Sequence, residues 1–150
     1  LNLKFERMRI LKKILISTDF SPAAWRSVKM GLDFSTSRHV CITLLHVYPS
    51  KKADDFGTDT DQRNISDLKR EMQRFCAEIE ETVDACIEPV LLVGDVNKEI
   101  IEFIKKEPYD LVIIGVNSNG SNNDPGSHTA EIIKSSTVPV LVVPNLPLVA

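Results

Sequence analysis

Short apolar runs alternate along this chain with segments in which apolar residues recur every three or four positions. The runs are nearly continuous, are rich in Val, Ile and Leu, and lie at residues 14–16, 40–47, 90–93, 111–114 and 138–143. Such runs are typical of parallel strands that are covered on both faces. The pattern therefore predicts five buried strands.

The segments between these runs predict four helices. The clearest stripe has steps of three and four and consists of Ile65, Leu68, Met72, Phe75, Ile79 and Val83. We interpret it as the core-facing side of a helix. Ser21 and Pro22 predict the cap and first turn of an earlier helix, a third runs from Val96 to before Pro108, and a fourth starts near Ser127.

Strands and helices that alternate in this way predict an α/β fold. Right-handed crossovers would assemble the elements into a doubly wound five-stranded parallel sheet with four helices, in one domain over residues 11–150. Residues 49–64 are polar without clear periodicity, so we expect a mobile segment there. Its aspartates lack the spacing of a calcium loop, so no metal site is predicted.

The composition of the chain limits its possible partners and cellular location. The net charge of −3 argues against general attraction to nucleic acid. The absence of a spanning apolar run and of a signal-peptide pattern leads us to expect a cytoplasmic protein with no membrane contact. Residues 1–10 are expected to be an extension outside the domain, in part a processing or cloning remnant.

Cys41, Cys76 and Cys86 lack CxxC spacing and are interpreted as small buried apolar residues, with a redox role as the alternative.

The candidate chemistry lies where the strands end. After the fourth run comes Gly115, then a polar loop, then Gly126 and Ser127 at a predicted helix start, an arrangement that suits phosphate. The loop contains no Lys or Arg and does contain Asp124. Asp19 directly follows the first strand, where a carboxylate either binds ribose hydroxyls or caps the next turn.

Three other phosphate-binding patterns are excluded. A receiver domain needs a phosphoacceptor Asp after the third strand and a Lys after the fifth, but this chain has Val93-Gly94-Asp95 and Val143-Pro144. Neither GxxxxGK[ST] nor GxGxxG after the first strand is present.

The motifs in their order resemble the universal stress protein family over residues 11 to 144. They are KKILISTDFSPAA, ITLLHVY, GDVNKEIIEFIKKEPYDLVIIG, and GS followed by VPVLVVP. The resemblance implies strand order 3-2-1-4-5, a homodimer formed through the last strands and, in some members, ATP bound between strands one and four.

The resemblance also implies which residues bind a nucleotide. Asp19 would contact the adenosine and Val47 would line the adenine pocket. In the family's phosphate loop, G-x2-G-x9-G-[ST], Ser118 stands at the middle glycine, seven residues instead of nine separate it from Gly126, and Asn119 replaces a frequent basic residue. These departures would weaken triphosphate binding.

The predicted nucleotide-binding residues are Ser17, Thr18, Asp19, Val47, Gly115, Ser118, Gly126, Ser127 and His128. The expected ligand is ATP or another adenine nucleotide, with Mg²⁺ if it is ATP. His46 is interpreted as a packed or hydrogen-bonded structural residue. Trp25 is expected to pack between helix and sheet, with a partner contact as the alternative.

Three hypotheses for function remain open. The first is a dimeric stress-response sensor or interaction module that binds an adenine nucleotide, the second a slow ATP-hydrolysing switch, and the third an interaction module without nucleotide. No catalytic residue set is evident. The predicted dimer edge consists of Val138, Val140, Leu141, Val142 and Val143.

Overall fold

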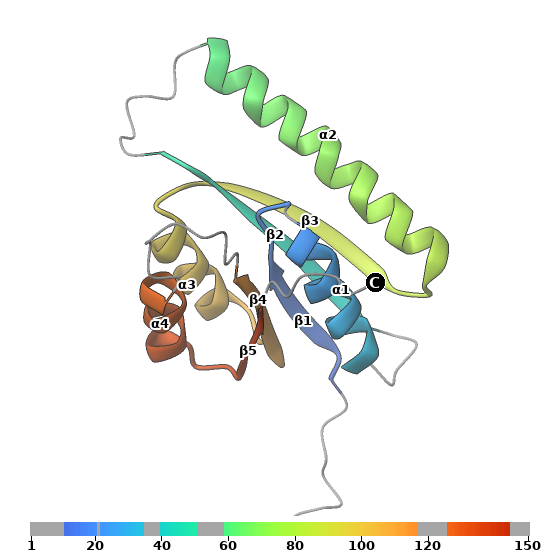
Figure 1. Cartoon of the computed structure of the whole chain (residues 1–150), viewed down its shortest axis with the longest axis vertical. Helices are drawn as coiled ribbons and strands as arrows, with labels where there is room; N and C mark the ends of the chain where they lie inside the picture. The colour runs from blue at the N-terminus through green and yellow to red at the C-terminus, as the bar shows by residue number, and fades with distance from the viewer. Residues whose placement is uncertain (1–10, 21, 35–39, 51–58, 117–125, 145–150) are drawn as a thin grey trace, which may run out of the picture.

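The computed structural model describes residues 11–20, 22–34, 40–50, 59–116 and 126–144. The strands are β1 (Lys13–Ser17), β2 (Cys41–Pro49), β3 (Cys86–Gly94), β4 (Leu111–Val116) and β5 (Val140–Pro144). The helices are α1 (Pro22–Phe34), α2 (Asp59–Thr82), α3 (Val96–Lys106) and α4 (Gly126–Ser135). The strands form one parallel sheet in the order β3-β2-β1-β4-β5, which confirms the predicted fold and strand order (Figure 1).

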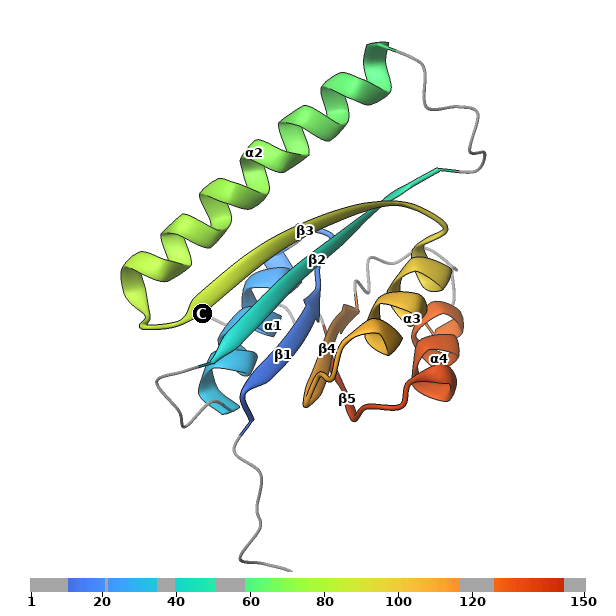
Figure 2. The ribbon, with the colours of Figure 1, turned by 180° about the vertical axis from the view of Figure 1, so that it is seen from behind.

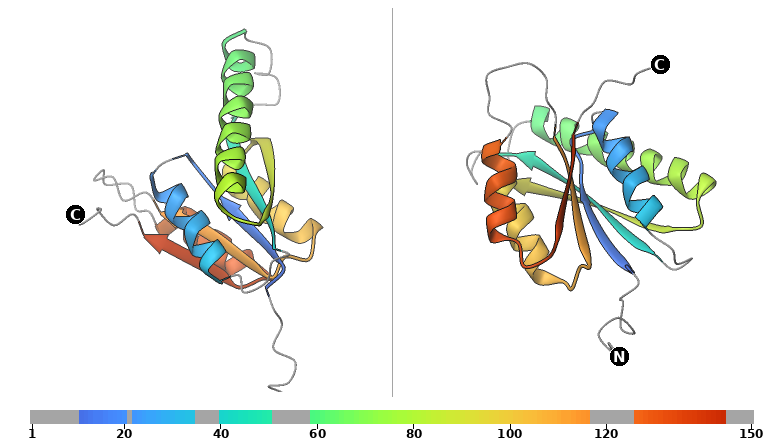
Figure 3. Two further views of the ribbon diagram at one scale, coloured as in Figure 1. Left: turned by 90° about the vertical axis from the view of Figure 1, so that its right-hand side faces the viewer. Right: turned by 60° about the horizontal axis from the view of Figure 1, so that its bottom comes forward.

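The helices cover the two faces of the sheet in pairs (Figures 2 and 3). Side chains of α1 and α2 pack on one face with Ile14 and Ile16, and side chains of α3 and α4 pack on the other with Leu15. These three β1 residues are fully buried. Since side chains alternate along a strand, β1 contributes to both cores.

The third strand is longer than its apolar run. It begins at Cys86, whereas the apolar run predicted a strand from about residue 90. Glu88 and Pro89 interrupt the apolar pattern in the first half of the strand, and both residues are exposed. Because β3 is an edge strand, it tolerates a proline that cannot donate a backbone hydrogen bond and a charge that faces water.

The segment 49–64, expected to lack regular structure, is partly regular. Pro49 ends β2, and α2 begins at Asp59, while residues 51–58 lie outside the described part of the chain. The first buried residue of α2 is Met72. The turns before Met72 do not contribute to the core, so their sequence can be polar. Asp59 and Asp61 lie in the first turn, where carboxylates favour the helix dipole, and the Tyr48 hydroxyl donates to Asp61 Oδ1 at 3.1 Å.

Two further expectations are corrected. Cys76 is buried as expected, but Cys41 and Cys86 are exposed, and each is the first residue of its strand. Trp25 does not pack against the sheet. Its ring lies 4.4 Å from that of Phe75 on α2 and the residue is 46% exposed, so it bridges two helices on the surface.

The turn from β3 to α3 is fixed by a glycine and a cap. Gly94 has φ +151°, and a Cβ there would lie 2.9 Å from Glu99 Oε1. Asp95 then accepts a hydrogen bond from the Lys98 N–H at 2.9 Å, as a helix N-cap does. This turn sets where the first residues of α3 lie at the carboxyl edge of the sheet.

Replacing the cap should destabilise the fold. Asp95→Ala leaves the Lys98 N–H without its side-chain acceptor, so we expect the free energy of unfolding to fall by about 1 kcal/mol. Asp95→Asn, which keeps an acceptor oxygen, should lose less. Urea unfolding measures both, and an Asp95→Ala variant as stable as wild type would contradict this role.

Candidate functional site

A crevice of about 400 Å³ opens at the carboxyl ends of the central strands. β1 pairs with β2 on one side and β4 on the other, so the chain's crossovers diverge at this point. Open α/β sheets commonly bind ligands at such a switch point. The lining residues are Ser17, Thr18, Asp19, His46, Val47, Pro49, Val96, Asn97, Ile100, Ile114, Gly115, Thr129 and Ile132.

The polar side of the crevice is the turn that follows β1. The Thr18 N–H donates to the Leu45 carbonyl at 2.8 Å, and the Phe20 N–H donates to Thr18 Oγ1 at 3.0 Å. Phe20 has φ 62°, a left-handed conformation that costs a bulky residue on the order of 1 kcal/mol. These contacts fix the backbone on both sides of Asp19, whose side chain is exposed at the crevice.

His46 holds the same turn from β2. Its Nδ1 lies 2.7 Å from the Thr18 carbonyl oxygen, and since a carbonyl only accepts, Nδ1 carries the proton. The ring also packs on Phe20, with centroids 4.8 Å apart. His46 is therefore hydrogen-bonded and packed, as expected, and it also lines the crevice.

The opposite side of the crevice is apolar. Val47, Ile100, Ile114 and Ile132 line it, and each is at least nine-tenths buried. They come from β2, α3, β4 and α4, so the wall belongs to the core on that face of the sheet. A flat apolar ring has a preformed surface to pack against here.

Asn97 is the buried polar group of this site. Its Nδ2 donates to Glu131 Oε2 at 2.7 Å, which ties the start of α3 to α4. Its Oδ1 is buried and has no hydrogen-bond partner among the described residues. A buried acceptor without a donor costs about 1–3 kcal/mol, so this side chain weakens the fold.

The structure brings most of the predicted nucleotide-binding residues together. Ser17, Thr18, Asp19, Val47 and Gly115 all line the crevice. Gly126, Ser127 and His128 form the first turn of α4, and Thr129, the next residue, lines the crevice. Ser118 lies outside the described residues.

Sequence reasoning missed Asn97, Thr129 and Pro49. For Asn97 a signal was available, because Asn97, Ile100 and Ile104 follow the helical steps of one buried stripe. A polar residue on such a stripe indicates either an internal partner or a ligand. Pro49 and Thr129 gave no comparable signal.

The fold and this crevice define a doubly wound α/β domain with an open crevice at its switch point. A sequence profile of the universal stress protein family matches residues 11–144. The chain belongs to the universal stress protein family.

The relatives agree in sequence and fold. Universal stress protein MJ0577 of Methanocaldococcus jannaschii is 29% identical over 155 residues, which cover 88% of this chain and 94% of that protein. Its solved structure superimposes with a TM-score of 0.78 at 30% identity, and the match covers 93% of this chain and 99% of the other.

Two more distant structures share the fold and contain nucleotides. An Archaeoglobus fulgidus universal stress protein was solved in complex with dAMP (TM-score 0.66, 21% identity, 90% of this chain and 99% of that one). An Arabidopsis thaliana family member was solved with AMP bound (TM-score 0.60, 18% identity, 91% and 93%). In the present chain, the described helices include none with the length and apolar character needed to span a membrane.

Removing the unpaired oxygen of Asn97 should stabilise the protein. In Asn97→Leu, a side chain of nearly the same shape replaces the amide and removes the buried acceptor. Glu131 is exposed, so its carboxylate can then hydrogen-bond to water. We expect the free energy of unfolding to rise by about 1 kcal/mol, measured by urea unfolding.

Glu131→Gln is the matched control, because it keeps an acceptor for Asn97 Nδ2 and leaves Oδ1 as it is. Its stability should stay close to wild type. A loss of stability in Asn97→Leu would contradict the expectation that the unpaired oxygen outweighs the hydrogen bond to Glu131.

Proposed function

We propose that this chain binds an adenine nucleotide in the crevice between β1 and β4 and acts as a homodimeric stress-response sensor or interaction module. The observation that carries the proposal is the pairing of a fixed polar turn with an apolar wall at the switch point. The cytoplasmic setting is proposed from the sequence alone.

The two sides of the crevice match the two parts of a nucleoside. Asp19 offers carboxylate oxygens that accept from ribose hydroxyls, and Thr18 is held beside it by the Leu45 carbonyl. Val47 and Ile114 offer an apolar surface for the face of a base. The volume of about 400 Å³ is within the range of small-molecule sites.

The charge around the crevice supports a ligand with few phosphates. No Lys or Arg is present among the described lining residues. The loop between Gly115 and Gly126 also contains no basic residue and contains Asp124. Each missing charge-assisted contact forgoes about 1.5–3 kcal/mol. AMP and ADP should therefore bind at least as well as ATP with Mg²⁺, and the dAMP and AMP complexes of the two relatives agree with this ligand class.

Slow ATP hydrolysis ranks second. Among the described lining residues, a nucleophile with a neighbouring base is lacking, although Asp19 and the start of α4 could position a nucleotide. A nucleotide-independent interaction module is the remaining alternative, and the binding experiment below separates it from the first proposal.

The homodimer proposal rests on the free edge of β5. β5 ends the sheet, and among the described residues its outer edge has no strand partner. Parts of the predicted edge already serve the core, since Val143 is buried, Leu141 packs against one core cluster, and Val138 and Val140 pack against the other. Val142 is half-buried and belongs to neither cluster. Its side chain and the open backbone edge are the parts available to a second copy.

Nucleotide binding is tested by isothermal titration of AMP, ADP and ATP with Mg²⁺. We expect wild type to bind AMP in the micromolar range and Asp19→Ala to bind it about 10–100-fold more weakly, because the ribose hydroxyls lose a charged acceptor. Asp33→Ala, which removes an exposed carboxylate from the other end of α1, is the matched control and should bind like wild type. No heat and no thermal shift with millimolar nucleotide would leave the nucleotide-independent module.

The dimer is tested by sedimentation of two charge substitutions. Val142→Glu should shift the protein towards monomer while leaving it folded, because the side chain packs in neither core cluster. Leu141→Glu should instead lower the free energy of unfolding, since that side chain packs on the core. A folded Val142→Glu variant that dimerises like wild type would show that β5 is not the interface.

A further inference from the structure

Two of the three cysteines lie opposite one another on adjacent strands. Cys41 is the first residue of β2 and Cys86 is the first residue of β3, and the two are register partners. Neighbouring parallel strands lie about 4.7–4.9 Å apart, and disulfides join Cα atoms separated by roughly 4.4–6.8 Å. The backbone therefore already satisfies the main distance requirement of a disulfide.

The thiol groups meet on one face of the sheet. Register partners in a parallel sheet project to the same side, so the two thiol groups lie on the same face of the sheet. Both backbones are anchored here, since the Cys41 N–H donates to the Lys12 carbonyl at 2.8 Å and the Cys86 N–H donates to the Val40 carbonyl at 3.1 Å. Two anchored, adjacent strands therefore present their first side chains to the same face.

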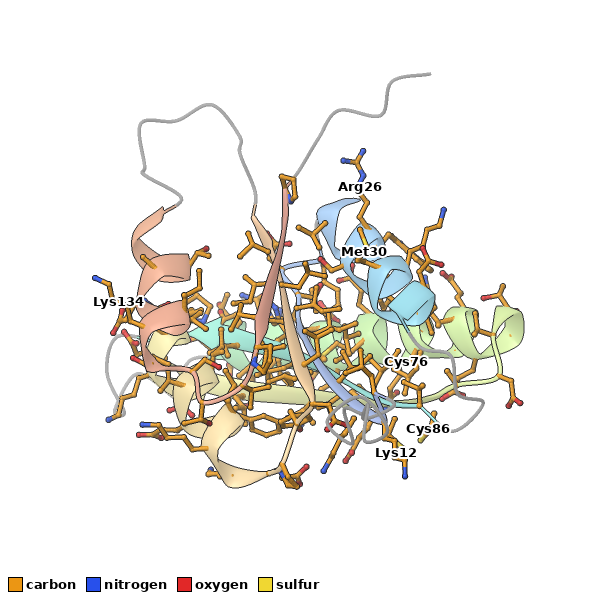
Figure 4. All side chains as sticks on the ribbon, turned by 90° about the horizontal axis from the view of Figure 1, so that it is seen from below. Lys12, Arg26, Met30, Cys76, Cys86 and Lys134 are labelled. Carbon is orange, nitrogen blue, oxygen red and sulfur yellow. The ribbon has the colours of Figure 1, made fainter. Side chains whose placement is uncertain are left out.

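The pair is accessible, whereas the third cysteine is not. Cys41 and Cys86 are exposed. Cys76 belongs to the core cluster on the opposite face, where burial raises the pKa of its thiol to about 11. In Figure 4, Cys86 lies near the lower rim of the view and Cys76 lies further in. Within the described part of the chain, no third His, Cys, Asp or Glu joins the pair as a metal site would require.

We propose that Cys41 and Cys86 form a redox-active dithiol site, which a peroxide oxidises to an intramolecular disulfide between β2 and β3. One thiolate attacks hydrogen peroxide, so that an S–O bond forms, the O–O bond breaks and, after protonation, water leaves. The second thiol attacks the resulting sulfenic acid, and a second water leaves as the S–S bond forms. Two thiols and one peroxide thus give one disulfide and two waters.

The two cysteines have different charged neighbours. The hydrogen bond to Cys41 raises the pKa of Cys86, and the charges of Glu80 and Glu88 raise it further, so Cys86 keeps its proton. Lys13 is the register partner of Cys41 on the other side, and its ammonium group interacts with the Cys41 sulfur as well as with Glu107. Whichever of the two thiols attacks the peroxide, the other closes the disulfide.

The site is tested on the reduced, purified full chain treated with hydrogen peroxide, with N-ethylmaleimide labelling under denaturing conditions and intact mass as the readouts. Wild type should lose two of its three labelled thiols and the mass of two hydrogen atoms, and dithiothreitol should restore both. A peptide map should contain the Cys41–Cys86 crosslink. The oxidised form should also unfold at higher urea, because the disulfide restricts the unfolded chain.

Single Ser substitutions separate this proposal from general thiol oxidation. Cys76→Ser should still lose two labelled thiols, whereas Cys41→Ser and Cys86→Ser should form no intramolecular disulfide; circular dichroism checks that each variant is folded. Three labelled thiols in peroxide-treated wild type, or disulfides only between chains, would overturn the proposal. The result is independent of nucleotide binding, because the cysteines lie at the amino ends of the strands and the crevice at their carboxyl ends.

Discussion

The pairing of β1 on both of its edges is the constraint on which the rest of the structure depends. β1 aligns with β2 over five residues and with β4 over four, and its three central residues are fully buried between two layers of helices. Because its neighbours come from different halves of the chain, the crossovers leave β1 in opposite directions. The crevice exists because the sheet reverses its strand order at this strand.

Polar contacts hold both ends of this strand in place. At its start, Asp110 Oδ2 accepts from the backbone N–H groups of Lys12 and Lys13 at 3.0 and 2.9 Å. At its end, His46 and the backbone of Leu45 bind Thr18. One carboxylate from beside β4 and one imidazole from β2 therefore fix the strand in position. The turn that bears Asp19 is therefore held in place as well. A binding site functions best when its residues are fixed before the ligand binds.

The sequence allowed the fold to be predicted, and the site in part. Continuous apolar runs are unambiguous in the interior of a parallel sheet, so they predict the central strands. The edge strand β3 begins with four residues of which three are exposed, so its apolar run predicts too late a start. The start of α2 was missed for the same reason, since its first turns extend beyond the sheet and have no buried residue. Within the site, the residues at the end of β1 can be predicted, because their position directly after a strand places them at the carboxyl edge of the sheet. The spacing of Asn97, Ile100 and Ile104 places Asn97 on a buried stripe but does not identify its partner, and the exposure of Cys41 and Cys86 depends on which part of a face the helices cover.

Two features that weaken the fold lie at the crevice. Phe20 has a left-handed backbone, and Asn97 has a buried oxygen that is unpaired among the described residues. Features of this kind persist where surrounding contacts impose them and tend to occur at functional sites. The amino end of β2, far from the crevice, shows no such strain in its described residues. Cys41 is exposed there, and its backbone makes ordinary hydrogen bonds to the neighbouring strand. A disulfide there would join two strands that are already paired, so it would restrain the edge strand β3 without displacing β1. The sheet can thus contain an oxidisable pair at one end and a ligand crevice at the other, and chemistry at one need not alter the geometry of the other.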